Sequence, residues 1–428
     1  MKELLVLLHQ QLIGVLQQSK GGARTFQYLE GVPIAGELSL ALPYRLDAYP
    51  PRKTNPFIEG LLPEGAGVRE AMGRQFEISP TNPFALLEHI GLECAGAVQF
   101  VHPDELDNAL SGEGALTPYT EVEIGRRLRA LGAQPQGSWV VTRERWSLAG
   151  AQSKFALRME KGRWYEASGA EPTTHIIKPG IHDFQDQALN EHLCLHTLDI
   201  AGLSTARTQY VEFDGSPAIV IERYDRHRDE SGIVRRIHQE DFCQATSTLP
   251  HRKYESNKGP NALTIIKVLR EAEAAEEEVN RFIDGLIGNY LLGAPDAHAK
   301  NYSVILAPGI TALAPFYDVA SGLPYRRESH DEYKYNDDDG LRGAAMAIGG
   351  QRRFGRISRR HWLRFAQEAR VNEDWLLERV KSLAEIIPEA LDHVIRQEKE
   401  AIGDSELPNR LLNPVRHLCE TTLTQLEN

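Results

Sequence analysis

The most constraining feature of the sequence is an apolar helical run that stops abruptly and is followed by polar residues at fixed spacing. The run ends at Gly293 and Pro295, Asp296 stands just past the stop, Asn301 follows five positions later, and Asp318 comes after another apolar stretch. Phosphoryl transfer needs a carboxylate to orient the attacking hydroxyl, together with an amide and a carboxylate that hold magnesium ions. Protein kinases carry these groups in this order and with this first spacing. We therefore predict that Asp296 is catalytic and that Asn301 and Asp318 bind Mg²⁺.

A simpler interpretation of the same residues is a polar loop after a helix. In that case Asp296 only caps a turn, and His298 is an ordinary surface histidine. The spacing Asp-x4-Asn is common, so spacing alone does not choose between the two interpretations. Lys300 is a candidate for neutralising a transferring phosphate, because a lysine ammonium acts as a point charge at a phosphate.

The residues around these acids resemble the C-terminal signatures of the HipA family. The two segments are Gly-Ala-Pro-Asp-Ala-His-Ala-Lys-Asn-Tyr-Ser at 293–303 and Leu-Ala-Pro-Phe-Tyr-Asp-Val at 313–319. Members of that family are bacterial serine/threonine kinase toxins, usually encoded beside a small DNA-binding antitoxin of the HipB type. The resemblance implies a kinase that uses ATP and Mg²⁺. It also implies that His298, Lys300 and Tyr317 join Asn301 and Asp318 in the nucleotide site.

The first hundred residues carry no recognisable chemistry, but they extend the resemblance. Segments 61–65 (Leu-Leu-Pro-Glu-Gly), 82–84 (Asn-Pro-Phe) and 94–97 (Cys-Ala-Gly-Ala) are similar to the N-terminal subdomain of full-length HipA proteins. The resemblance continues to about Phe365. Phe-Tyr-Asp-Val at 316–319 departs from the Asp-Phe-Gly of eukaryotic kinases, so their activation-loop switching is not expected here.

A second candidate element is the loop Ser-Leu-Ala-Gly-Ala-Gln-Ser-Lys at 147–154. Its small residues could cradle phosphate oxygens with backbone N–H groups. The loop is neither a Walker A motif nor GxGxxG, and a tight β-turn is the alternative. Similarity to the family's phosphate loop favours nucleotide binding by the residues Ala149, Gly150, Ala151, Gln152, Ser153 and Lys154. The corresponding serine of the family is autophosphorylated, which implies that Ser147 is a modification site.

A strand ending in Lys178 is followed, thirteen residues later, by Glu191 at the start of an apolar helix. Kinases pair a strand lysine with a helix glutamate to fix the α- and β-phosphates, and we predict this role for both residues. The alternative is a surface ion pair worth about 1 kcal/mol at most. The apolar strand 218–222 has the composition of the hinge between kinase lobes. There the resemblance implies that backbone groups of Glu222 and Tyr224 face the adenine, and Arg223 is expected in the same nucleotide site.

Apolar periodicity and the resemblance together predict an α+β, protein-kinase-like two-lobed fold with a β-rich N-terminal subdomain. In residues 1–104, Gly14, the Gly21-Gly22 turn and the extended run 34–42 favour a meander of strands over a helix. Residues 105–226 are expected to form the small lobe of the kinase-like fold. Residues 227–428 show helical spacing and are expected to form a mostly helical large lobe.

Charge and cysteine content narrow the class of protein. The 428 residues include 48 basic and 60 acidic ones, and the resulting net charge of −12 argues against a general nucleic-acid-coating protein. The four cysteines lie far apart without zinc spacing, which favours the cytoplasm. The N-terminus lacks a signal-type cleavage site, and no stretch approaches the roughly 20 apolar residues of a membrane span.

The function expected from these features is that of a toxin of a type II toxin–antitoxin pair that phosphorylates a cytosolic, translation-related protein and itself. Aminoacyl-tRNA synthetases are among the family's targets, but nothing in these residues selects one. The alternatives are a small-molecule kinase and a non-catalytic module that holds a DNA-binding partner. Seven arginines at 352, 353, 356, 359, 360, 364 and 370 could touch operator DNA bound mainly by an antitoxin. They could equally form a solvated helix face or a substrate surface.

Overall fold

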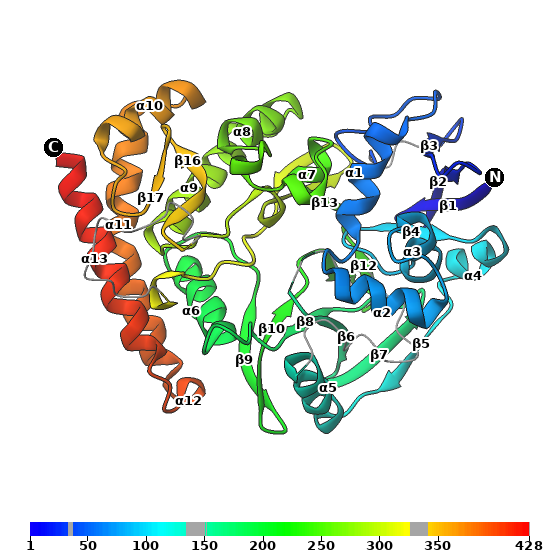
Figure 1. Cartoon of the computed structure of the whole chain (residues 1–428), viewed down its shortest axis with the longest axis horizontal. Coiled ribbons are helices and arrows are strands. Elements are labelled where there is room, and N and C mark those ends of the chain that lie inside the picture. The colour runs from blue at the N-terminus through cyan, green and yellow to red at the C-terminus, as the bar shows by residue number, and fades with distance from the viewer. Residues whose placement is uncertain (33–36, 134–149, 151, 326–340, 428) are drawn as a thin grey trace. The chain divides into compact units, whose positions relative to one another are not determined.

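A computed structural model describes residues 1–32, 37–133, 150, 152–325 and 341–427 of the chain (Figure 1). The chain divides into two compact units, each assembled from three separate segments. Unit 1 comprises Met1–Ile181, Val211–His251 and Ser303–Ala314. Unit 2 comprises His182–Tyr210, Arg252–Tyr302 and Pro315–Asn428. The division into three consecutive domains stays a prediction.

Unit 1 begins with an antiparallel meander, as the sequence predicts. Its four-stranded sheet has the order β3-β2-β1-β4, with β1 at Lys2–Leu8, β2 at Gln11–Gln18, β3 at Arg24–Tyr28 and β4 at Val98–Val101. Gly14 lies opposite Tyr28, and a Cβ atom at Gly14 would lie only 2.6 Å from the carbonyl oxygen of Gln27. The absence of a side chain at Gly14 therefore allows β2 and β3 to pair closely.

The predicted extended run at 34–42 is wrong in its described part, because residues 37–42 form turns. Their backbone is bonded by side chains, including those of Tyr28 and Glu240, rather than by a neighbouring strand. The hydroxyl of Tyr28 accepts from the N–H of Leu38 at 3.0 Å and donates to the carbonyl of Leu42 at 2.7 Å. Because this buried hydroxyl satisfies both backbone groups, the segment needs no sheet partner.

The rest of unit 1 consists of short helices and a second, larger sheet. The six-stranded sheet has the order β5-β7-β6-β8-β10-β9. Its strands are β5 (Gly114–Pro118), β6 (Phe155–Glu160), β7 (Arg163–Gly169), β8 (His175–Lys178), β9 (Thr208–Phe213) and β10 (Ser216–Glu222). Smaller sheets contain β11 (Arg226–Arg228), β12 (Val234–Arg236), β13 (Gln239–Asp241), β14 (Ser303–Ala307) and β15 (Ile310–Leu313). The α-helices are α1 (Pro51–Leu61), α2 (Ala66–Phe76), α3 (Pro83–Ile90), α4 (Leu106–Ser111), α5 (Glu121–Ala133) and α7 (Phe242–Ala245).

One hydrophobic core joins both large sheets of unit 1. The same cluster of buried side chains includes Leu4 and Phe57 from the N-terminal part and Phe155, Ile177 and Val220 from the six-stranded sheet. The first hundred residues therefore pack as part of unit 1 rather than as an appendage to it. The first hundred residues, which carry no recognisable catalytic motif, therefore contribute to the hydrophobic core of unit 1.

Unit 2 is mostly helical, in agreement with the predicted C-terminal lobe. Its helices are α6 (Gln187–Ile200), α8 (Ala262–Glu271), α9 (Glu276–Leu291), α10 (Arg359–Ala369), α11 (Glu373–Gln397), α12 (Lys399–Ile402) and α13 (Leu407–Glu427). A hairpin of β16 (Gly343–Ile348) and β17 (Gln351–Arg353) accompanies them. The longest helix, α11, packs against α6, α9, α10 and α13, and it runs beside α13 in Figure 1. Among the described residues, no helix is both long and apolar enough to cross a membrane.

Candidate active site

The position of Asp296 is set by how α9 ends. Gly293 follows the helix with a φ of 64°, and a Cβ atom there would lie 2.5 Å from the side chain of Leu323. Glycine is therefore needed at this position both for its backbone conformation and for space. The N–H of Ala294 closes the helix end on the carbonyl of Asn289 at 2.8 Å. The chain then turns sharply and presents Asp296 immediately after Pro295.

Asp296 and Asn301 belong to one small, internally bonded loop. The backbone carbonyl of Asp296 accepts from the Asn301 side-chain Nδ2 at 2.8 Å and from the His298 N–H at 2.8 Å. Because the amide of Asn301 donates through its nitrogen, its oxygen is the atom that it offers to a cation. The Asp296 carboxylate is 62% exposed and accepts from the Tyr254 hydroxyl at 2.5 Å. The loop thus holds an accessible carboxylate in a defined orientation.

His298 is not the surface histidine of the simpler interpretation, because only 3% of its side chain is exposed. Its ring meets the ring of Tyr254 edge to face at 4.8 Å, and its Nε2 lies 3.9 Å from Asp296 Oδ1. Burial, followed by the positive charge of Lys253, lowers the pKa of His298 to about 3. The ring is therefore neutral at pH 7. It supports the Tyr254 and Asp296 pair by packing rather than by charge.

Phe316 anchors the segment that carries the second acid. The ring fills the space left by Gly285 of α9, where a Cβ atom would lie 2.3 Å from it. The N–H of Phe316 donates to the carbonyl of Ser204 at 2.9 Å, and its carbonyl accepts from the N–H of Ala206 at 2.8 Å. The ring also meets that of Tyr302 edge to face. Side-chain packing and backbone hydrogen bonds of Phe316 together fix the position of the chain just before Tyr317 and Asp318.

Tyr317 then ties this segment to the loop that carries Asn301. Its hydroxyl donates to the backbone carbonyl of Lys300 at 2.8 Å. Asp318 adopts a φ of 54°, a left-handed conformation that aspartate tolerates better than most residues and that clusters at functional sites. The charge of Asp318 raises the pKa of His298, against the larger lowering effect of burial, so its carboxylate lies within electrostatic range of that ring. The predicted residues at 296–301 and 317–318 therefore lie near one another in unit 2.

Tyr254 and Lys253 are functional candidates that sequence reasoning missed. Tyr254 lies forty-two positions before Asp296, and no spacing rule connects them. The backbone carbonyl of Lys253 accepts a hydrogen bond from the N–H of Ala299 at 3.3 Å. This bond connects the chain around Lys253 to the 296–301 loop. The resemblance to the HipA family, which continues to about Phe365, spans both residues but assigned them no role. Lys300, by contrast, was predicted, and its side chain is almost fully buried.

Unit 1 holds the predicted phosphate loop, of which Gly150, Gln152, Ser153 and Lys154 are described. Gly150 has a φ of 108°, and a Cβ atom there would lie 2.6 Å from Lys154 Nζ. The carbonyl of Gly150 accepts from the N–H of Glu64 at 3.1 Å, within a short bridge to Pro63. A lysine ammonium therefore lies against a glycine backbone that the N-terminal motif at 61–65 holds in place. Ala149, Ala151 and Ser147 lie outside the described residues.

The remaining predicted nucleotide contacts of unit 1 lie at strand ends. Lys178 ends β8 and is buried, whereas Glu222 ends β10 and is exposed. The Tyr224 hydroxyl donates to Gln239 Oε1 at 2.5 Å. Glu191, the predicted partner of Lys178, is buried on α6 of unit 2. Since the two residues belong to different units, their pairing stays a prediction.

The described contacts of Arg223 give it a structural role, and its nucleotide contact stays a prediction. Its buried guanidinium lies 2.9 Å from Glu93 Oε1 and 2.8 Å from Asp225 Oδ2. Its N–H donates to the carbonyl of Thr174 at 2.9 Å, and its own carbonyl accepts from the N–H of Arg226 at 3.2 Å. Buried charges require such partners, and this network satisfies them within unit 1. Arg223 therefore holds the end of β10 in position for its neighbours.

Comparison with known proteins decides the family. Residues 4–101 match the model of the HipA N-terminal domain, and residues 146–393 match the model of the HipA-like C-terminal domain. The chain belongs to the HipA family. Both predicted signatures of the family, at 293–303 and 313–319, lie within the second match.

Individual HipA relatives agree with this assignment. The chain is 33% identical over 417 residues to the protein named Putative kinase Y4mE of Sinorhizobium fredii, covering 95% of this chain and 94% of that one. It is 30% identical over 281 residues to the Serine/threonine-protein kinase toxin HipA of Shewanella oneidensis, covering 62% of each. A chain from the solved complex of Shewanella oneidensis HipA, HipB and operator DNA superposes with a TM-score of 0.81 at 24% identity. That match covers 99% of this chain and 98% of the other, which confirms the predicted kinase-like α+β fold.

Proposed function

We propose that this HipA-family chain is an ATP- and Mg²⁺-dependent serine/threonine protein kinase and the toxin of a toxin–antitoxin pair. The observation that carries the proposal is the convergence of Asp296, Asn301 and Asp318 around one bonded loop of unit 2. The exposed Asp296 carboxylate, oriented by the Tyr254 hydroxyl, has the form expected of the group that accepts or orients a substrate hydroxyl proton. The name of the Shewanella relative supports the same chemistry and the same target residues.

The donor atoms present fit a magnesium ion. Mg²⁺ prefers carboxylate and carbonyl oxygens, and Asn301 and Asp318 each supply one of these types. The Asn301 nitrogen is already committed to the Asp296 carbonyl, which leaves its oxygen for the ion. Asn301 and Asp318 would hold Mg²⁺, and the bound ion would neutralise negative charge on the nucleotide phosphates. Lys300 would add positive charge at the transferring phosphate.

ATP is the proposed phosphate donor, and the residues of unit 1 would bind it. Lys154 and the backbone of the loop around Gly150 would face the phosphates, while Lys178, oriented by Glu191, would pair the α- and β-phosphates. The strand end at Glu222 and Tyr224 would contact the adenine. Autophosphorylation at Ser147 remains part of the proposal. A phosphate there would place about −1.5 to −2 charges next to N–H groups that otherwise serve the nucleotide.

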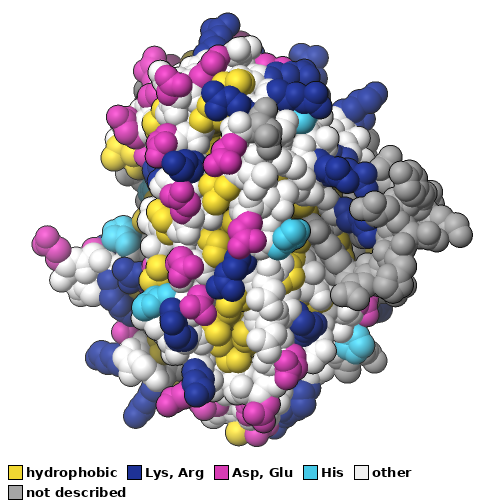
Figure 2. Space-filling view, turned by 90° about the vertical axis from the view of Figure 1, so that its left-hand side faces the viewer, with side chains coloured by type: hydrophobic (Ala, Val, Ile, Leu, Met, Phe, Trp, Pro, Cys, Tyr) yellow, Lys and Arg dark blue, Asp and Glu magenta, His cyan; other side chains and the backbone are white. Residues whose placement is uncertain are grey.

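The proposed partners are a HipB-like antitoxin and a cytosolic protein substrate, with an aminoacyl-tRNA synthetase as one candidate class. The antitoxin would bind operator DNA, as the Shewanella complex contains HipA, HipB and operator DNA together. All seven arginines between 352 and 370 are exposed, which keeps DNA contact, substrate contact and a solvated face open. Figure 2 shows Lys and Arg mixed with Asp and Glu over much of one face of the molecule, and several Lys and Arg side chains lying together near its upper right.

Tyr254→Phe tests whether the Tyr254 hydroxyl orients Asp296. Hydrogen bonds to charged groups contribute about 1.5–3 kcal/mol, and the exposure of Asp296 favours the lower end. We therefore expect the turnover number to fall about tenfold while the affinity for ATP stays unchanged. Steady-state kinetics measured beside wild type would check this. A variant with wild-type turnover would show that Asp296 is oriented without the hydroxyl.

Growth of the producing cells tests the toxin function. Expression of the wild-type chain alone is expected to slow growth, because the kinase would inactivate a protein needed for translation. Asp296→Asn should grow like an empty-vector strain, and the matched control Asp404→Asn, an exposed acid between α12 and α13, should be as toxic as wild type. Equal growth of wild type and Asp296→Asn at equal protein levels would favour a housekeeping kinase or a non-catalytic scaffold.

A further inference from the structure

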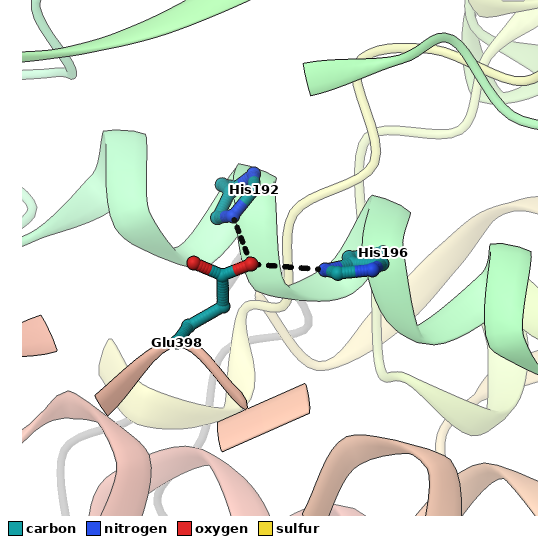
Figure 3. A group of neighbouring side chains, drawn as sticks. All are labelled: His192, His196 and Glu398. Carbon is teal, nitrogen blue, oxygen red and sulfur yellow. Dashed lines mark ion pairs between the residues drawn. The ribbon is translucent and has the colours of Figure 1, made fainter. Parts of the chain in front are cut away.

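Unit 2 contains a second polar cluster that the proposed kinase chemistry does not use. His192 and His196 lie one turn apart on α6, and Glu398 lies where α11 ends and α12 begins (Figure 3). Glu398 Oε1 lies 3.6 Å from His192 Nε2 and 3.4 Å from His196 Nδ1. The three donor atoms all lie within 4.8 Å of one another. Two imidazoles and a carboxylate thus point at one small volume.

The two imidazole nitrogens that face Glu398 are buried and make no hydrogen bond, although both lie within ion-pair distance of its carboxylate. Buried polar atoms without partners are uncommon, and each needs an explanation. The opposite nitrogen of His192, Nδ1, is engaged with the Thr208 hydroxyl at 2.8 Å. Such an outer contact fixes the ring orientation of a metal-binding histidine and leaves the other nitrogen for the ion.

We propose that His192, His196 and Glu398 form a binding site for a divalent transition-metal ion, with Zn²⁺ as the best fit. In a tetrahedral site with ligand bonds of about 2.0–2.1 Å, donor atoms lie about 3.3 Å apart. The two distances to Glu398 are already close to that value, and the two histidine nitrogens lie within 4.8 Å of each other. Three protein ligands with a water in the fourth position match an open zinc site. Two imidazoles disfavour Mg²⁺ and Ca²⁺, which prefer oxygen ligands.

An ion at this site would fasten α6 to the junction of α11 and α12. Helix α6 already packs against α11, so the ion would reinforce an existing contact within unit 2. The site goes beyond the proposed kinase function, since none of its ligands is placed in the catalytic loop. One of its residues is next in sequence to a predicted kinase residue, because His192 directly follows Glu191, the predicted partner of Lys178. The expected effect of the ion is on the stability of unit 2.

Cobalt binding tests the site without reference to kinase activity. The full-length chain is stripped with EDTA, dialysed and titrated with Co²⁺, which absorbs strongly in tetrahedral sites and weakly in octahedral oxygen sites. Wild type should bind one tetrahedral Co²⁺ that Zn²⁺ displaces. At a hundredfold excess over the dissociation constant, Zn²⁺ should also raise the melting temperature by roughly 3–6 °C.

Matched variants show whether the metal ion binds at His192, His196 and Glu398 or elsewhere on the chain. His196 and Glu398 are 29% and 26% exposed, so His196→Ala and Glu398→Gln should fold, as circular dichroism would verify. Each should weaken Co²⁺ binding at least about tenfold and abolish the Zn²⁺-induced shift. His393→Ala and Glu389→Gln, exposed on α11, and Asp318→Ala in the candidate active site should keep both signals. Absence of the tetrahedral band in wild type, or equal bands in all variants, would overturn the proposal and leave a simple histidine–carboxylate pair.

Discussion

Asp318→Ala is expected to lower phosphate transfer on the order of 1,000-fold. The carboxylate is the charged ligand proposed for Mg²⁺, and a bound metal contributes several kcal/mol of charge stabilisation in such reactions. The hydrogen bond from Tyr317 to the Lys300 carbonyl and the packing of Phe316 at Gly285 are made by other atoms, so the variant should keep its fold. The measurement is a single-turnover assay at saturating ATP over a range of Mg²⁺ concentrations.

A second substitution separates the metal role of Asp318 from its backbone conformation. The φ of 54° strains an alanine more than an asparagine, because asparagine visits the left-handed region more readily. Asp318→Asn should therefore keep the backbone and still lose about 100-fold or more, with partial recovery at high Mg²⁺. Wild-type rates in Asp318→Asn would mean that the alanine variant failed for conformational reasons and that Asp318 is not an essential metal ligand.

Asp296→Asn is expected to lower the turnover number by about 10²–10⁴-fold, the usual contribution of a general acid–base group. The affinity for ATP should remain within about twofold of wild type, because the proposed role of this acid is on the acceptor hydroxyl. Isothermal titration with a non-hydrolysable ATP analogue, beside kinetics, measures both quantities. Asp404→Asn serves as the control. An equal loss of binding and turnover would instead assign Asp296 to the metal.

The features that the sequence predicts well are those whose geometry depends on residues close together in the sequence. Asp296 and Asn301 lie on one loop whose turn is dictated by Gly293 and Pro295, so their approach is local. The N-terminal meander likewise follows from Gly14 and from short turns. The predicted extended run is wrong over residues 37–42, because distant side chains such as those of Tyr28 and Glu240 bond the backbone groups there.

The features that sequence reasoning missed depend on contacts between distant segments. Tyr254 reaches Asp296 across forty-two residues, and Arg223 forms its buried pair with Glu93, 130 residues away. Glu64 looked chemically silent, yet its N–H holds the carbonyl of Gly150 in the phosphate loop. His192 and His196 have helical spacing, but Glu398, the third residue of the proposed metal site, lies beside them only because α6 packs against α11. No spacing rule along one segment reports such pairs.

Transfer of the γ-phosphate of ATP to protein tests the central claim most directly. The purified chain is incubated with ATP labelled either at the γ- or at the α-phosphate, with Mg²⁺ or with EDTA, and protein-bound label is measured. We predict label on serine or threonine only from γ-labelled ATP with Mg²⁺, in wild type and Asp404→Asn, and background levels in Asp296→Asn and Asp318→Ala. Label that persists in EDTA, comes from the α-phosphate, or appears equally in Asp296→Asn would contradict the account.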